Sequence, residues 1–286
     1  MKSRSLFTHS VVALSALLAM PVGVIAQQAL ERHGKHLSRY TVTDLGVLGE
    51  GTNSSAFDMN NAGWVAGSSN LTPGGPQHAF LWYGDGPLQD VGTLGGPNSA
   101  ADGPNGFGEA PIISEIAKTD PDGEDFCGFG THLECRGAIW RYGRLTALRG
   151  LPGGRNSIPI GINNLGQLVG WAENGIRDST CATATPFQVY RVEAVKWEPN
   201  GEIEKLRPLT EMGDTVAFSF GINDRGQAVG SSGTCATQGL PSANITGLHA
   251  VRWERDGSPT YLGTLGDAHN TKSNIASSIN ERGMVV

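Results

Sequence analysis

The chain has 286 residues, of which 41 are glycine and only 17% are charged, and its formal net charge is −6. Average soluble proteins contain about 7% glycine and about 25% charged residues, so this composition favours a turn-dense all-β protein over a helical one. A mildly acidic chain without a cluster of lysine or arginine argues against nucleic acid and anionic lipid as partners.

The first 26 residues predict a secretory signal peptide of the Sec type. Lys2 and Arg4 give it a positive start, residues 11–24 are apolar but too few to span a bilayer, and small residues before position 27 suit cleavage. An N-terminal anchor helix is the alternative. We expect residues 27–39 to form a flexible segment, and the mature protein to be periplasmic or extracellular without membrane insertion.

Export makes the four cysteines candidates for disulfides. We favour pairing of Cys127 with Cys135, because the glycine-rich sequence between them can bend back. We favour pairing of Cys181 with Cys235, because both occur in the sequence Thr-Cys-Ala-Thr. Free thiols and the other pairings stay open, since connectivity cannot be deduced from sequence.

An internal repeat organises the rest of the chain. The segment GINNLGQLVG at 161–170 returns as GINDRGQAVG at 221–230. Each repeat predicts a strand, a tight Asn-Gly hairpin, a returning strand, a variable loop, a third strand ending in tryptophan, a second hairpin and a fourth strand. The four tryptophans are spaced 58, 57 and 56 residues apart: Trp82, Trp140, Trp197 and Trp253.

Four short antiparallel strands per unit predict a β-propeller over residues 40–286, with about four full blades and a partial fifth. A solenoid is the alternative. A lone four-stranded sheet exposes two apolar faces, and neighbouring units must cover them. We therefore expect the four tryptophans in the inter-blade core, with sugar stacking as the minority interpretation.

Residues 278–286 stop within the second strand of a fifth repeat. One interpretation is that these strands close a mixed blade with the early strand near residues 41–48. The other, which we favour, is a C-terminally truncated chain, because ending within a strand leaves an unpaired edge.

The repeat resembles the bacterial extracellular HAF repeat family. The resemblance covers about residues 40–286 and rests on His78-Ala79-Phe80-Leu81-Trp82, on the related 249–253 and on the Ile-Asn-x-x-Gly-Gln and Gly-Thr-Leu-Gly segments. It implies secretion and a propeller-like repeat, and it implies no activity. Arg136 and Glu193 replace the histidine in the middle units, so the histidine is not a shared ligand.

Variable loops on a rigid scaffold are where binding residues concentrate. We expect a loop-rich face, stiffened by disulfides, to bind a glycan or a protein, and the protein to be a monomer. The candidate binding residues all lie in or beside the variable loops: Asn70, His132, Arg177, Phe187 and Asn244.

The acidic run at 120–125 is the main chemical candidate. Asp120, Asp122 and Asp125 offer the oxygen ligands that Ca²⁺ prefers, although the run does not match an EF-hand. The alternative is a solvated, decayed copy of the Asn-Asn-x-Gly turn, which the second unit otherwise lacks. No other cofactor is indicated.

Catalytic motifs are few, and we expect no enzymatic activity. The alternative is an extracytoplasmic polysaccharide hydrolase or lyase, in which Glu109 and Glu115 would form the carboxylate pair that glycoside chemistry requires.

Overall fold

The computed structural model describes residues 41–181, 188–235, 248–264 and 274–286. The chain divides into two compact units, Met1–Asp44 and Leu45–Val286. The predicted signal peptide and the segment 27–39 lie outside the described residues. In the described ranges, no helix combines the length and hydrophobicity needed to cross a membrane.

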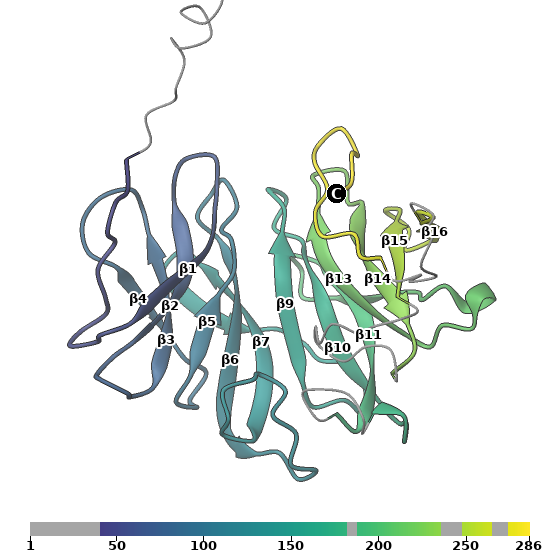
Figure 1. Ribbon diagram of the computed structural model, residues 1–286, viewed down its shortest axis with the longest axis horizontal. Helices are drawn as coiled ribbons and strands as arrows, with labels where there is room; N and C mark the ends of the chain where they lie inside the picture. Colours follow the sequence, from purple (N-terminus) through teal and green to yellow (C-terminus); the bar gives the residue numbers. More distant parts are fainter. Residues whose placement is uncertain (1–40, 182–187, 236–247, 265–273) are drawn as a thin grey trace, which may run out of the picture. The chain divides into compact units, whose positions relative to one another are not determined.

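The second unit forms four antiparallel sheets of four strands each, and together they make a four-bladed β-propeller (Figure 1). Within each sheet the strands pair in sequence order, as a meander. The first blade contains β1 (Ser54–Met59), β2 (Val65–Asn70), β3 (Gln77–Trp82) and β4 (Gln89–Gly92). The second contains β5 (Ser99–Ala101), β6 (Ala110–Thr119), β7 (Leu133–Arg141) and β8 (Arg144–Ala147).

The third blade contains β9 (Ser157–Ile162), β10 (Leu168–Arg177), β11 (Tyr190–Trp197) and β12 (Ile203–Leu206). A short 3-10 turn, η2 (Thr210–Met212), leads to the fourth blade. That blade contains β13 (Val216–Ile222), β14 (Ala228–Gly233), β15 (His249–Trp253) and β16 (Pro259–Tyr261). The predicted fold class is therefore confirmed.

The repeated tryptophans pack between blades. Trp140 lies in one buried cluster with Ala66 and Leu81 of the preceding blade. Trp197 and Trp253 are fully buried and donate their indole N–H groups to backbone carbonyls of the preceding blade, at 2.7 Å in each case. The prediction of an inter-blade core is confirmed for these three, whereas Trp82 is half-buried and donates to the Gly86 carbonyl of its own hairpin. The buried indole hydrogen bond explains why tryptophan serves better than phenylalanine at positions 197 and 253.

A chain of asparagines links the blades at their first hairpins. The side-chain amide of Asn60 donates to the Asn105 carbonyl at 2.8 Å, and Asn105 donates to Asn163 at 3.0 Å. Asn163 donates to Asn223 at 2.9 Å, and Asn223 donates to Asn280 at 3.1 Å. In every case the side-chain oxygen also accepts the N–H two residues further on, which fixes the turn. One residue type therefore closes each hairpin and couples it to the next blade.

The second blade does not lack this turn, contrary to the sequence interpretation. Asn105, in the connection between β5 and β6, occupies the turn position. The acidic run 120–125 lies instead in the loop between β6 and β7, at the opposite end of β6. Its interpretation as a decayed turn is therefore wrong. The sequence concealed the true turn because Asn105 lacks the neighbouring isoleucine and glutamine of the motif.

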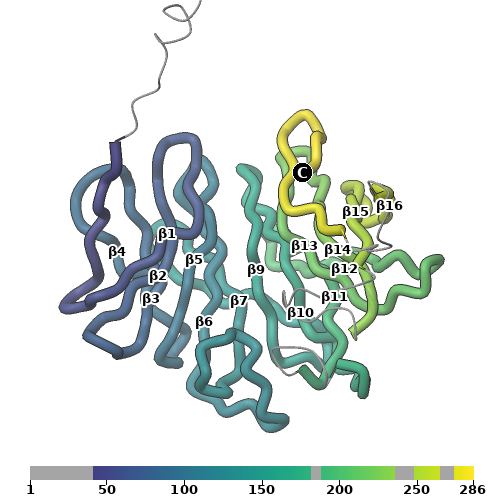
Figure 2. Tube along the Cα trace, in the orientation of Figure 1, coloured from purple at the N-terminus to yellow at the C-terminus, as the bar shows by residue number. Residues whose placement is uncertain are grey.

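The C-terminal residues lie beside the fourth blade (Figure 2). Ala276 donates its backbone N–H to the Gly230 carbonyl, and Ile279 forms one antiparallel bridge with Val285. Of the predicted partial fifth blade, the described residues contain this bridge and the Asn280 turn. Early in the unit, Leu48 and Glu50 hydrogen bond to the first blade, to the Ser69 hydroxyl and the Leu71 carbonyl.

Candidate functional site

The connections between second and third strands define what we call the loop face, at the strand ends opposite the asparagine turns. They comprise residues 71–76, 120–132, 178–189 and 234–248. Residues 182–187 and 236–247, with the candidates Phe187 and Asn244, lie outside the described residues. The remaining candidates are Asn70, His132 and Arg177, and each lies in or beside one of these connections.

Two disulfides hold the loop face. Cys127 pairs with Cys135 and Cys181 pairs with Cys235, with Cα atoms 5.2 and 4.5 Å apart, so both predicted pairings are present. The first closes the β6–β7 loop, and the second joins the third blade to the fourth. All four cysteines belong to one apolar cluster that also contains Phe126. Disulfides of this kind indicate an oxidising compartment.

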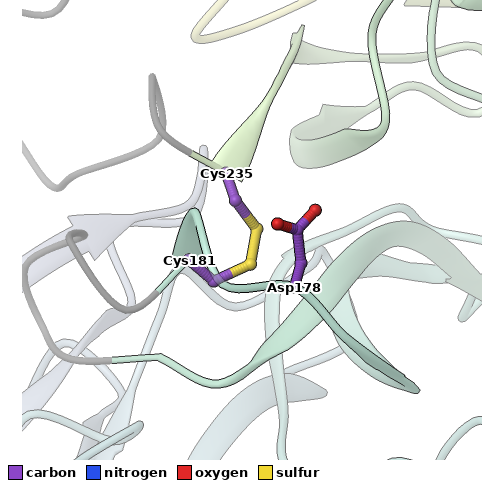
Figure 3. Close-up of side chains that lie close together, drawn as sticks. All are labelled: Asp178, Cys181 and Cys235. Carbon is purple, nitrogen blue, oxygen red and sulfur yellow. A yellow bond between two sulfur atoms is a disulfide. The ribbon is translucent and has the colours of Figure 1, made fainter.

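Asp178 lies beside the second disulfide (Figure 3). Within the described ranges, Asp178, Cys181 and Cys235 are the only three potential metal ligands whose atoms lie within 4.8 Å of one another. A disulfide offers no thiolate, so this group does not suit a metal. The Asp178 carboxylate accepts hydrogen bonds from Thr180 and Arg191, and these contacts lower its pKa.

The three aspartates of the acidic run do not converge on one point. Asp120 is buried; one of its oxygens accepts the Asp122 N–H at 2.8 Å and the other accepts the Asn156 amide at 3.1 Å. Asp125 accepts the Gly130 N–H at 2.9 Å, which closes the loop. Each carboxylate is thus used in shaping the β6–β7 loop. The Ca²⁺ site stays a prediction, without a ready cage among these residues.

Asp122 is the centre of an ion cluster. It pairs with Arg155 at 2.7 Å and with Arg177 at 2.5 Å, and it accepts the Tyr190 hydroxyl at 3.1 Å. Both guanidinium groups lie over the Tyr190 ring, 5.4 and 5.0 Å from its centre. Hydrogen bonding from Arg177 lowers the pKa of Asp122. Two guanidinium groups therefore share the single carboxylate of Asp122 at the surface of the loop face.

His132 borders the same cluster. It is exposed, and its Nδ1 lies 2.9 Å from the Gly123 carbonyl, next to Asp122. The structure therefore brings two of the candidate residues, His132 and Arg177, to one part of the loop face around Asp122. Sequence reasoning missed Arg155 and Tyr190, which come from an inter-blade link and from the start of β11.

Asn70 has a structural role in the first blade. Its side-chain oxygen accepts the N–H groups of Thr52 and Asn53, in the link that precedes β1. Glu173 does the same in the third blade, where one carboxylate oxygen accepts the N–H groups of Arg155 and Asn156. This repeated acceptor on the second strand anchors the inter-blade link, and it leaves the Asn70 oxygen little capacity for a ligand.

A second pair of carboxylates lies below the ion cluster. Glu124 and Glu173 are both fully buried and interact with each other. Burial, and then the neighbouring Glu124 charge, raise the pKa of Glu173 to about 8. Its Oε1 has no N–H donor nearby, so a proton held between the two carboxyl groups satisfies it. Nothing in the sequence marked this pair, because its members lie in different blades.

Glu109 and Glu115, the candidate catalytic pair, lie apart. Glu109 precedes β6 and pairs with Arg141 at 2.5 Å, whereas Glu115 lies within β6 and accepts the Asn98 amide at 2.9 Å. Six residues of strand separate them by roughly 20 Å, against the ~5–9.5 Å that glycoside hydrolysis needs. The two do not form a catalytic pair.

No family model matches this chain, and no curated protein matches it either.

Proposed function

We propose that this chain is an extracytoplasmic, non-catalytic member of the HAF repeat family whose loop face binds a glycan that carries carboxylate groups. The observation that carries the proposal is the cluster in which Arg155 and Arg177 share the single carboxylate of Asp122. The two disulfides and the resemblance to a secreted family support an oxidising location.

Two guanidinium groups around one carboxylate favour an acidic ligand at this position. The side chain of Arg177 is 62% exposed, so its guanidinium can exchange or share its contact with Asp122 for an incoming carboxylate. Arginine suits this exchange because its planar donors match a carboxylate in two parallel hydrogen bonds. His132, exposed beside it, adds a second polar group to this part of the loop face.

The side chains and the loop of this cluster are held in place in the free protein, which favours affinity for a ligand. Arg155 and Arg177 stack on Tyr190, and the Cys127–Cys135 bridge closes the loop that supplies Asp122. Side chains and loops that are already ordered lose less conformational entropy on binding. The loop face therefore offers a ligand a surface that is already ordered before binding.

A hydrolase or lyase is the weaker candidate for this face. Glu109 and Glu115 are too far apart, and Glu124 and Glu173 are fully buried, where a polysaccharide cannot reach them. Binding without turnover is the function that these positions favour.

Affinity electrophoresis through polygalacturonate, with dextran as the neutral comparison, tests the proposal. We expect polygalacturonate to retard the chain and dextran to leave it unaffected, with the retardation falling as salt rises. Arg177→Ala should weaken binding at least tenfold. Arg144→Ala, which removes the same charge from an exposed position in β8, should not.

Equal retardation of the two variants would contradict the role of Arg177. Release of reducing ends or of unsaturated uronides from polygalacturonate would favour the enzyme instead. Binding to a protein fraction, without binding to polygalacturonate, would contradict a glycan ligand and favour a protein partner.

A further inference from the structure

A cavity of about 690 Å³ lies where the first strands of the blades meet. It is lined by parts of β1, β9 and β13, by residues 102–104 after β5, and by residues 275–279. A volume of this size suits a small organic molecule, since ligand pockets measure about 300–1,000 Å³. None of the residues around Asp122 and Arg177 lines this cavity.

One part of the cavity is aromatic and aliphatic. Trp171 meets Phe218 and Phe220 edge to face, with ring centres 5.1 and 6.0 Å apart. Ile160 and Leu248 extend this apolar lining. Trp171 and Phe218 also pack against the cluster that contains both disulfides, so this part of the wall is firmly held.

Two carboxylates line the same cavity toward the asparagine turns. Asp58 is the second-last residue of β1, and Asp102 directly follows β5. Gly103, which follows Asp102, allows the approach of Asp58, because a Cβ at this position would overlap the Asp58 carboxylate. No lysine, arginine or histidine is found among the described residues that line the cavity.

These carboxylates lack a cationic partner in the described part of the chain, where the ion pairs all involve other residues. Burial, and then the charge of Asp58, raise the pKa of Asp102 to about 6. A half-buried carboxylate beside a second one gains most from a cation that enters between them.

We propose that this cavity binds an apolar amine, whose protonated nitrogen lies between Asp58 and Asp102 and whose hydrophobic body packs against Trp171, Phe218 and Phe220. The charge of the lining selects the cation, and the aromatic wall selects the body. Aromatic faces add attraction for a cation that lies above them. A metal ion suits the site less, since two carboxylates and an apolar wall offer too few oxygens.

Calorimetric titration of the full chain at pH 7.5 tests the proposal with 4-phenylbutylamine and its neutral counterpart 4-phenylbutanol. The two probes share the hydrophobic body and differ in charge. We expect the amine to bind at least tenfold more tightly than the alcohol. Equal affinities, or the absence of binding by the amine, would overturn the proposal without any variant.

Asp102→Asn should reduce the preference for the amine at least fivefold. The matched control is Asp85→Asn, which removes the same charge from an exposed turn and should leave the preference unchanged. A thermal melt of each variant verifies that it folds. Loss of amine affinity in both variants would overturn the proposal, because it would indicate an effect of overall charge.

The pH dependence gives a further test. Asp58 and Asp102 are the only titratable side chains in the described lining, and the amine stays protonated throughout. Because the pKa of Asp102 is about 6 in the free protein, lowering the pH from 7.5 to 5 should protonate it and weaken amine binding, and the alcohol should be unaffected. An amine affinity that does not change over this range would contradict the role of Asp102.

Discussion

Replacing Asn163 tests whether the asparagine chain holds the blades together. The buried side chain makes four hydrogen bonds: it donates to the Gln167 side chain and the Asn223 carbonyl, and it accepts from the N–H groups of Leu165 and Gln167. Each bond contributes about 1 kcal/mol, and the Leu165 N–H can turn to water. Asn163→Ala should therefore lower the free energy of unfolding by about 3 kcal/mol.

Urea unfolding, followed by tryptophan fluorescence and by far-UV circular dichroism, measures this loss. The matched control is Asn200→Ala, at an exposed hairpin of the same blade, where the side chain accepts one hydrogen bond from Glu202. It should cost less than about 1 kcal/mol. Equal losses in the two variants would refute the role given to the buried asparagine chain.

Three further outcomes follow from the packing and the charges. Replacing Cys181 and Cys235 with alanine together should lower the free energy of unfolding by about 4 kcal/mol, measured by urea titration, because the bridge spans 54 residues. The pKa of Glu173 is raised to about 8 in the folded protein, above its value in the unfolded chain. The contribution of the protonated carboxyl group to stability is therefore full below about pH 4.5 and is lost as the pH rises through 8. In thermal melts across this range, Glu173→Gln should reduce the fall in stability with rising pH. Trp253→Phe should lower the free energy of unfolding by about 1–3 kcal/mol, since it removes the fully buried indole and its hydrogen bond to the Arg207 carbonyl. Trp82→Phe, at a half-buried site, should cost less in the same assay.

The fold could be predicted because each of its signals is local and recurs. The tryptophan spacing marked the third strands, and the Ile-Asn-x-x-Gly-Gln segments marked two of the first hairpins. The second blade escaped this reasoning because its turn keeps Gly103, Asn105 and Gly108 but has proline and glutamate in place of the isoleucine and glutamine of the motif. There the hydrogen bond to the next blade, rather than the surrounding sequence, determines the structure.

The candidate site could be predicted only in part. The positions of the loops could be predicted, because they follow the second strand of each repeat. Both disulfides could be predicted from the sequence around the cysteines. Arg155, Tyr190 and Glu173 could not be found in advance, because they reach the β6–β7 loop from the neighbouring blade. Asp58 and Asp102 likewise come together only through the packing of first strands. These contacts come from residues that do not recur from one repeat to the next, so no pattern within a repeat marks them.

Mapping the binding surface by NMR tests the central claim most directly. Backbone amide shifts of the isotope-labelled chain would be followed as a galacturonic acid oligosaccharide is added. The account predicts shifts concentrated in residues 120–132 and around Arg177 and Tyr190. Shifts confined to the asparagine turns, or an unchanged spectrum at millimolar oligosaccharide, would contradict it.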